Sequence, residues 1–187
     1  MLARAFDDDP VARFVFGAER RLKWGLRRFF RVQLEHLYLP HEAVWTTEDL
    51  AGAALWAPPG TPRPDLVSLW HLAPVLPFTL SKRVVNVARL IGALDHLRPE
   101  EPHWYLATLG TDPPRQGHGF GSALMRPVLE RCDEDGTPAY LESSKERNVP
   151  FYARHGFEVT KVLRLRGGAP PLWLMWREPK GESPGPY

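Results

Sequence analysis

The stretch Arg115-Gln116-Gly117-His118-Gly119-Phe120-Gly121 decides how this chain folds. Residues 103–111 alternate and are rich in aromatic and branched side chains, which predicts a β-strand before the stretch, and 120–133 predicts a helix after it. Glycines let the backbone take positive φ and approach a ligand closely, and the free N–H groups of a helix N-terminus attract anions. The loop therefore predicts either a phosphate or pyrophosphate site or a purely structural turn.

Two common phosphate-binding loops do not fit this stretch. A P-loop requires Lys and then Ser or Thr after its last glycine, but Gly121 is followed by Ser122 and Ala123. The dinucleotide fingerprint requires G-x-G-x-x-G, whereas the glycines here stand at 117, 119 and 121. The pattern therefore excludes both of these nucleotide-binding motifs.

The rest of the chain predicts an α/β order of elements. Asp9 before Pro10 is typical of a helix start. Before the loop, we expect helices at 10–16 and 19–37, strands at 42–47 and 50–56, and two or three short helices in 61–102, the clearest at 81–97. After the loop helix, we expect strands at 138–144, 158–165 and 173–177, with a short helix at 148–155.

Composition narrows the class of protein. Hydrophobic residues make up 43% of the 187 residues, enough for a buried core, and the formal net charge is only +2. This near balance argues against a protein that coats nucleic acid or an anionic membrane. The single Cys132 excludes a disulfide framework, and the seven histidines have no metal-ligand spacing, so we expect no metal. Asp7 follows the start too closely for a signal peptide, which predicts a cytoplasmic protein.

The motif Gln116-x-x-Gly119-x-Gly121 resembles the signature of the GNAT family of N-acetyltransferases. The resemblance extends over WYLATLGTDPPRQGHGFGSAL (104–124), AYLESS (139–144) and RNVPFYARHGFEV (147–159), in the family's order and spacing. Within the family, the second half is most similar to puromycin N-acetyltransferase and its relatives. The likeness is strong over about 103–157 and weaker over 7–60.

The resemblance implies an α/β GNAT fold. This fold has a mixed, mostly antiparallel central sheet with a splayed acetyl-CoA cleft and flanking helices. We expect the family's first β-strand to be missing here, because the sequence pattern begins at the helix that normally follows it. We expect a single domain over 1–179, with an acceptor-side half at about 1–102 and an acetyl-CoA half at about 103–179, and a flexible tail at 180–187.

The resemblance also implies a site for acetyl-CoA as co-substrate. The loop N–H groups and the Ser122 hydroxyl would hold the pyrophosphate, and the preceding strand would pair with pantetheine through its main chain. Asn148 is expected either to cap the next helix or to touch the cofactor. The implied cofactor-binding residues are Leu109, Gly110, Thr111, Arg115, Gln116, Gly117, His118, Gly119, Phe120, Gly121, Ser122 and Asn148.

Two side chains are implied in acetyl transfer. Tyr152, four residues before Gly156, occupies the family's position for the general acid that protonates the departing thiolate. Glu142 is the candidate general base. Strand alternation puts it on one face with Tyr140 and Ser144, and burial would strengthen its affinity for a proton. The alternatives are a packed aromatic residue for Tyr152 and a solvated strand end for Glu142.

The expected acceptor is the primary amine of a small molecule, such as an aminonucleoside or another antibiotic-like compound, which would make the chain an antibiotic-resistance enzyme. Two alternatives stay open, a protein or peptide N-acetyltransferase and a non-catalytic acyl-CoA sensor. We expect no nucleic-acid or membrane partner. Homodimers are common among proteins of this resemblance, so a homodimer is one expected state.

Overall fold

The computed structural model describes residues 1–17, 19–61, 82–165 and 167–181. The short helices expected between 61 and 81, and the expected tail from 182 onward, lie outside these ranges. Among the helices within the ranges, none combines the length and apolar composition that a bilayer-spanning helix needs.

Six strands form one open sheet in the order β1-β2-β3-β4-β6-β5. Every neighbouring pair is antiparallel except β3 and β4, which run parallel, so the expected mixed, mostly antiparallel sheet is confirmed. No strand precedes β1 among the described residues, as the sequence led us to expect. The strands are β1 (Val44–Thr46), β2 (Gly52–Ala57), β3 (Trp104–Thr111), β4 (Ala139–Ser143), β5 (Glu158–Leu163) and β6 (Leu172–Arg177).

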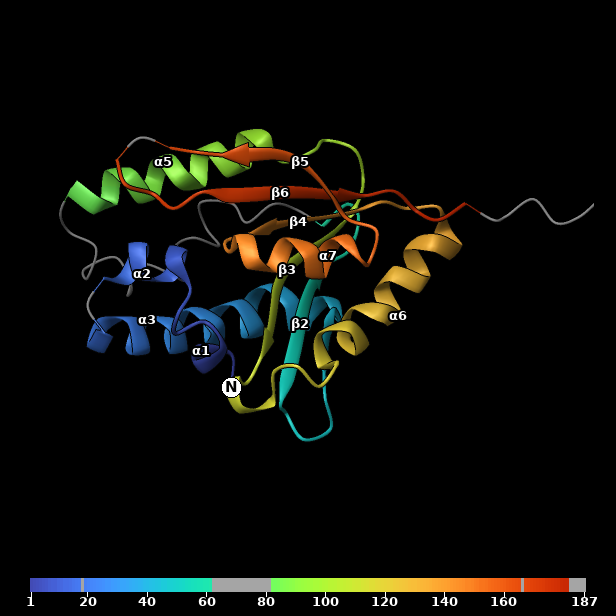
Figure 1. Cartoon of the computed structure of the whole chain (residues 1–187), viewed down its shortest axis with the longest axis horizontal. Helices are drawn as coiled ribbons and strands as arrows, with labels where there is room; N and C mark the ends of the chain where they lie inside the picture. The colour runs from blue at the N-terminus through green and yellow to red at the C-terminus, as the bar shows by residue number, and fades with distance from the viewer. Residues whose placement is uncertain (18, 62–81, 166, 182–187) are drawn as a thin grey trace, which may run out of the picture.

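The parallel pair β3 and β4 divides the sheet into two arms. Their register contains only Trp104↔Ala139, Tyr105↔Tyr140 and Leu106↔Leu141. β3 continues to Thr111 beside β2, while β4 continues beside β6. Figure 1 shows β2 and β3 running in a clearly different direction from β5 and β6. The expected splay is therefore present, and it opens immediately after Leu106 and Leu141.

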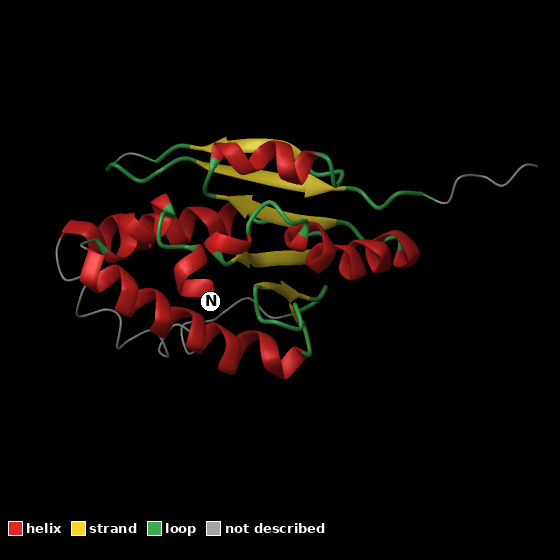
Figure 2. Cartoon of the chain, turned by 60° about the horizontal axis from the view of Figure 1, so that its bottom comes forward, coloured by secondary structure: helices red, strands yellow, loops and turns green. Residues whose placement is uncertain are grey.

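Helices cover both faces of the sheet (Figure 2). On one face, α6 (Phe120–Asp135) and α7 (Val149–Ala153) enclose a core that includes Trp56, Leu141 and Met175. On the other face, α3 (Glu19–Val32) packs over β2, and α5 (Lys82–Leu97) packs over β4 and β6. Odd and even residues of β4 therefore enter different cores, as the two-residue period of a strand requires.

The structure differs from the sequence expectation in the second helix. The helix expected over 19–37 ends as an α-helix at Val32, and the chain continues as a π-helical segment over Gln33–Tyr38 before Pro40. The wider π turn changes the face that later side chains present, and it leaves Tyr38 buried. The helix at 10–16 is confirmed, and Asp9 caps it by accepting a hydrogen bond from the Ala12 N–H at 2.8 Å.

A short helix that the sequence did not predict, α1 (Leu2–Ala5), lies directly on β3. Its contact depends on Gly110, because a Cβ there would stand 2.8 Å from Leu2 Cδ2 and 3.1 Å from Ala5 Cβ. The missing side chain lets the helix approach the strand closely. Gly110 therefore has a packing role in addition to the cofactor role that the resemblance implied.

Substituting Gly110 by Ala should lower the free energy of unfolding by about 1–3 kcal/mol, because the added methyl group overpacks this contact. The measurement is urea denaturation. Gly92→Ala is the matched control, since a Cβ at this exposed position on α5 meets nothing within 4 Å. Alanine there should raise stability by about 0.5–1 kcal/mol through helix propensity. Equal stability of G110A and the unaltered chain would mean that α1 does not pack on β3.

Candidate functional site

The glycine loop leads into the N-terminus of α6, which no side chain caps and around which there is open space. Gly117 and Gly119 both have φ of 81°, and a Cβ at either position would meet nothing within 4 Å. Gly119 is the N-cap of α6 by position, and no side chain caps this end of the helix. The first N–H groups of the 16-residue helix are therefore available to a ligand, and the helix dipole favours an anion there.

The polar side chains of the loop have structural contacts of their own. Gln116 Nε2 donates to the Thr111 carbonyl at 3.1 Å and so ties the loop to the end of β3. Arg115 pairs with Asp49 at 2.7 Å and lies over the Phe120 ring. His118 is exposed, with Nδ1 2.9 Å from the Gln116 carbonyl oxygen. Because the charge of Arg115 is already paired, the loop backbone is the stronger part of this anion site.

The end of β3 offers an unpaired edge beside the loop. On its β2 side the end of the strand is paired, with Ala54↔Leu109 and Gly52↔Thr111 in register. On the β4 side the pairing stops at Leu106. An extended ligand can therefore add to this edge as a strand does, through main-chain hydrogen bonds. Leu109, Gly110 and Thr111 lie in this segment, as the resemblance implied.

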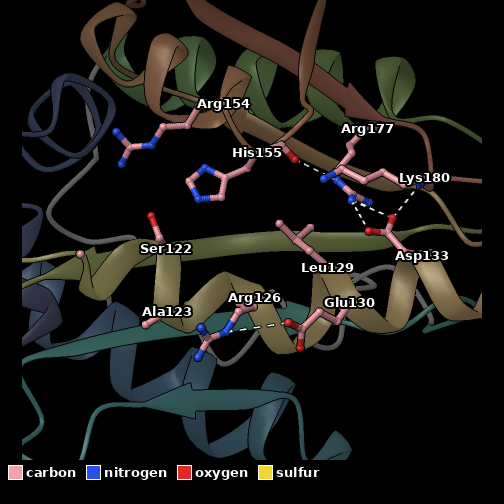
Figure 3. Close-up of a pocket in the computed structure, with 11 residues that line it drawn as sticks. Ser122, Ala123, Arg126, Leu129, Glu130, Asp133, Arg154, His155, Arg177 and Lys180 are labelled. Carbon is pink, nitrogen blue, oxygen red and sulfur yellow. Dashed lines mark hydrogen bonds and ion pairs between the residues drawn. The ribbon is translucent and has the colours of Figure 1, made fainter.

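A groove of about 460 Å³ runs from the loop between α6 and the turn after α7. Figure 3 shows Ser122 and Arg126 on the α6 side and Arg154 and His155 on the opposite side, with His155 directed into the space. Arg177 also lines the groove, but its guanidinium is paired with Asp133 at 2.7 Å. The sequence analysis did not single out Arg126 or Arg154 as site residues, although Arg154 lies within the RNVPFYARHGFEV stretch (147–159).

Tyr152 lies on the α6 and α7 side of the sheet. The residue is buried, and its ring packs edge-on against Phe157. Burial, followed by the charge of Asp9, raises the pKa of the Tyr152 phenol, so the hydroxyl keeps its proton at neutral pH. Asn148 precedes α7 but its side chain makes no capping bond, so the capping interpretation is wrong.

Glu142 lies on the opposite face of the sheet. Its side chain is 7% exposed, and Oε2 accepts a hydrogen bond from the Tyr105 hydroxyl at 2.6 Å. Burial raises the pKa of Glu142, while Arg98 and the tyrosine hydroxyls oppose this rise. The solvated strand end is therefore wrong. Tyr105 and Arg98 were also missed by sequence reasoning, because 37 positions separate Tyr105 from Glu142 in the chain.

The splay places Glu142 and Tyr152 on either side of one opening. Glu142 is the residue directly after the last β3–β4 pair, Leu106↔Leu141. Tyr152 contributes to the core on the other face, which contains Leu141. A group lodged where the arms diverge would therefore lie beside the buried carboxylate, with the core that contains the protonated phenol on the other face of the sheet. This arrangement suits a reaction in which one proton is removed and another is supplied.

The N-terminal segment spans this opening. Arg4 makes two hydrogen bonds of 2.8 Å to Asp112 at the end of β3. Asp8 pairs with Lys145 and Arg147 after β4. The segment therefore contacts the ends of both arms on the face that contains Glu142.

Other reactive groups lie away from the opening. Cys132 is fully buried on α6, and burial raises the pKa of its thiol to about 12, which keeps it from acting as a thiolate. Among the described residues, no group of three His, Cys, Asp or Glu side chains is placed to hold a metal ion.

Known proteins share this arrangement. The model of the acetyltransferase (GNAT) family matches residues 26–157. An uncharacterized N-acetyltransferase of Schizosaccharomyces pombe is 32% identical over 97% of this chain and 78% of its own length. A Corynebacterium glutamicum structure described as histone acetyltransferase HPA2 and related acetyltransferase is 27% identical, with a TM-score of 0.67 over 96% of this chain and 87% of that one.

A polyamine N-acetyltransferase of Drosophila melanogaster shares the fold, with a TM-score of 0.58 at 15% identity over 95% of this chain and 90% of that one. The family match covers more than half of the chain, and it includes the loop, the splayed strands and both candidate catalytic side chains. The chain therefore belongs to the GNAT family of acetyltransferases.

Proposed function

We propose that this GNAT acetyltransferase transfers the acetyl group of acetyl-CoA to the primary amine of a small molecule, with Glu142 as general base and Tyr152 as general acid. The observation that carries the proposal is the splay between β3 and β4. It has a buried carboxylate on one face and a buried phenol on the other.

Acetyl-CoA fits the residues around the opening. The uncapped N-terminus of α6, from Gly117 to Ser122, would bind the pyrophosphate, and the free edge from Leu109 to Thr111 would pair with pantetheine. Arg126 and Arg154, at the rim of the groove, would meet the phosphates of the nucleotide end. Asn148 and His118 stay candidates for further polar contacts.

The chemistry requires one bond to form and one to break. The amine nitrogen attacks the thioester carbonyl, an N–C bond forms, and the C–S bond breaks. Glu142 takes the proton that the nitrogen loses, directly or through water, and Tyr152 gives its proton to the departing sulfur. A main-chain N–H on the free edge of β3 would stabilise the oxyanion.

The class of acceptor has two candidates. The sequence likeness to puromycin N-acetyltransferases favours a small amine of the aminonucleoside kind, and with it a role in antibiotic resistance. The solved relative from C. glutamicum, described as a histone acetyltransferase and related acetyltransferase, favours a protein amine instead. The N-terminal segment contacts the ends of both arms on the face that contains Glu142, and a covered face of this kind favours the smaller acceptor.

The first experiment is to measure CoA release from acetyl-CoA with puromycin, a set of small primary amines, and peptides with a free N-terminus or lysine. Turnover of small amines with no turnover of peptides supports the proposal. Preference for peptides assigns the chain to the protein-acetylating class. Acetyl-CoA binding without turnover of any acceptor in the set would indicate a sensor.

Tyr152→Phe should lower kcat about tenfold or more while leaving the Kd of acetyl-CoA unchanged, because only the proton donor is removed. Glu142→Gln should lower kcat/KM for the acceptor about a hundredfold, because the base is lost. Stopped-flow kinetics and calorimetric titration measure the two quantities. Phe151→Leu, on the neighbouring ring, controls for packing. Full turnover by Y152F would remove Tyr152 from the reaction.

The raised pKa of Glu142 predicts opposite pH dependences for stability and activity. The folded chain keeps this proton at pH values where the unfolded chain has lost it. The free energy of unfolding should therefore fall, relative to that of E142Q, as pH rises through the window above the ordinary glutamate pKa. Activity should rise over the same window, because the base must be ionised. Denaturation series at several pH values, with parallel kcat/KM profiles, test both signs.

Arg154→Gln should weaken acetyl-CoA binding about tenfold, because one charge-assisted phosphate contact is lost. Arg31→Gln is the matched control. It removes one positive charge from α3, on the other face of the sheet, where Arg31 has only a 4.0 Å contact with Glu35. Calorimetric titration with acetyl-CoA measures both variants. Equal weakening in the two would point to net charge rather than to a contact in the groove.

A further inference from the structure

A buried polar cluster surrounds Glu142. Tyr105 and Tyr140 come from the adjacent strands, and their rings are stacked with centroids 5.9 Å apart. Tyr38 reaches the cluster from the π-helical segment, and Arg98 enters just after the end of α5. Burial raises the pKa of all three tyrosines, so their hydroxyls stay neutral. The charges in the cluster are therefore those of Arg98 and Glu142.

Arg98 is held by stacking rather than by a close ion pair. Its Cζ lies 4.0 Å from the centre of the Tyr105 ring, whereas its Nη2 is 3.9 Å from Glu142 Oε1. A charge-assisted hydrogen bond would need about 2.7–2.9 Å. The Arg98 side chain is 19% exposed. The guanidinium thus places a positive charge beside the carboxylate without occupying its oxygen.

Three buried polar atoms of this cluster have no hydrogen bond within the described part of the chain. They are Glu142 Oε1, the Tyr140 hydroxyl and Arg98 Nε, although the Tyr140 hydroxyl stays near enough to Glu142 to lower the pKa of that carboxyl. One of them accepts and the other two can donate. A ligand that satisfies the cluster must therefore both donate and accept. An uncharged primary amine has N–H donors and a lone pair, whereas an ammonium group has donors only.

We propose that Arg98 is a specificity-determining and positioning residue that makes this site select primary amines which are uncharged near neutral pH, such as α-amines of aminoacyl compounds, over strongly basic alkylamines. The inference rests on the proposed role of Glu142 and adds the chemical class of its acceptor. With Glu142 ionised, the buried charges of the cluster sum to zero. An incoming ammonium would add an uncompensated positive charge close to the guanidinium.

Arg98 also limits the basicity of Glu142. A positive charge nearby favours the ionised carboxylate, so the base is available at lower pH but removes protons less strongly. A weakly basic amine needs little help to become neutral, whereas a strongly basic one needs a stronger base. His103 contacts the outer side of Tyr140 with ring centroids 5.5 Å apart.

The test uses 2-phenylethylamine and its 2-fluoro and 2,2-difluoro derivatives, in which fluorine lowers the basicity of the nitrogen with little change in size. We expect kcat/KM of the unaltered chain, measured for all three amines at the same near-neutral pH, to rise along the series. In Arg98→Gln the ratio of kcat/KM for the difluoro compound to kcat/KM for the parent amine should fall at least tenfold. Arg98→Lys, which keeps the charge, should retain most of the preference. A ratio within one variant does not depend on how much of it folds.

The pH profile supplies a second readout. In R98Q the acid limb of kcat/KM should move to higher pH, because the carboxylate loses its neighbouring charge. An unchanged ratio and an unchanged acid limb in R98Q would overturn the role of Arg98 while leaving Glu142 as base. Normal turnover by E142Q would instead overturn the proposed function. Turnover of none of the three amines by the unaltered chain counts against a small-amine acceptor and removes this inference with it.

Discussion

The early end of pairing between β3 and β4 is the constraint on which the site depends. Three residue pairs hold these parallel strands together, and each strand then follows its other neighbour. Backbone groups beyond Leu106 thereby lose the partner that a continuous sheet would give them. Buried or half-buried main-chain groups need partners, so this edge is suited to an extended ligand. The fold keeps a binding edge open in the middle of its sheet, where its two arms meet.

Successive side chains of β4 point to opposite faces of the sheet, so the two sides of this opening differ chemically. Leu141 enters the core beneath α6 and α7, together with Tyr152, whereas Tyr140 faces α5. Glu142 follows on the α5 side, in contact with Tyr105. The proposed proton donor and the proposed proton acceptor are thus separated by the sheet itself. The neutral phenol and the buried carboxylate do not interact directly, so each can keep the protonation state that its own surroundings favour.

Local sequence patterns predict most of this fold, and contacts across the chain account for what they miss. The glycine loop, its flanking strand and helix, and the Asp9 cap depend on neighbours in sequence and are present as expected. The π-helical turn that leaves Tyr38 buried depends on packing and has no local pattern. Arg98 has no motif either, since it becomes significant only when the end of α5 meets β3 and β4. For Arg115 the local pattern is misleading. Its position in the motif predicts that it binds an anion, whereas in the structure its guanidinium forms an ion pair with Asp49.

Burial suits Glu142 for the proposed proton transfer, but burying its carboxylate also costs free energy in the folded chain. A buried carboxylate is costly unless it is paired and hydrogen-bonded, and here one oxygen is bonded while the other is not. Arg98 offsets part of this cost from a distance that leaves Oε1 accessible. The opening is spanned by Arg4–Asp112 and by the pairs of Asp8, and exposed ion pairs of this kind contribute little to stability. The fold therefore secures the carboxylate through Tyr105 and core packing rather than through the ion pairs of the N-terminal segment.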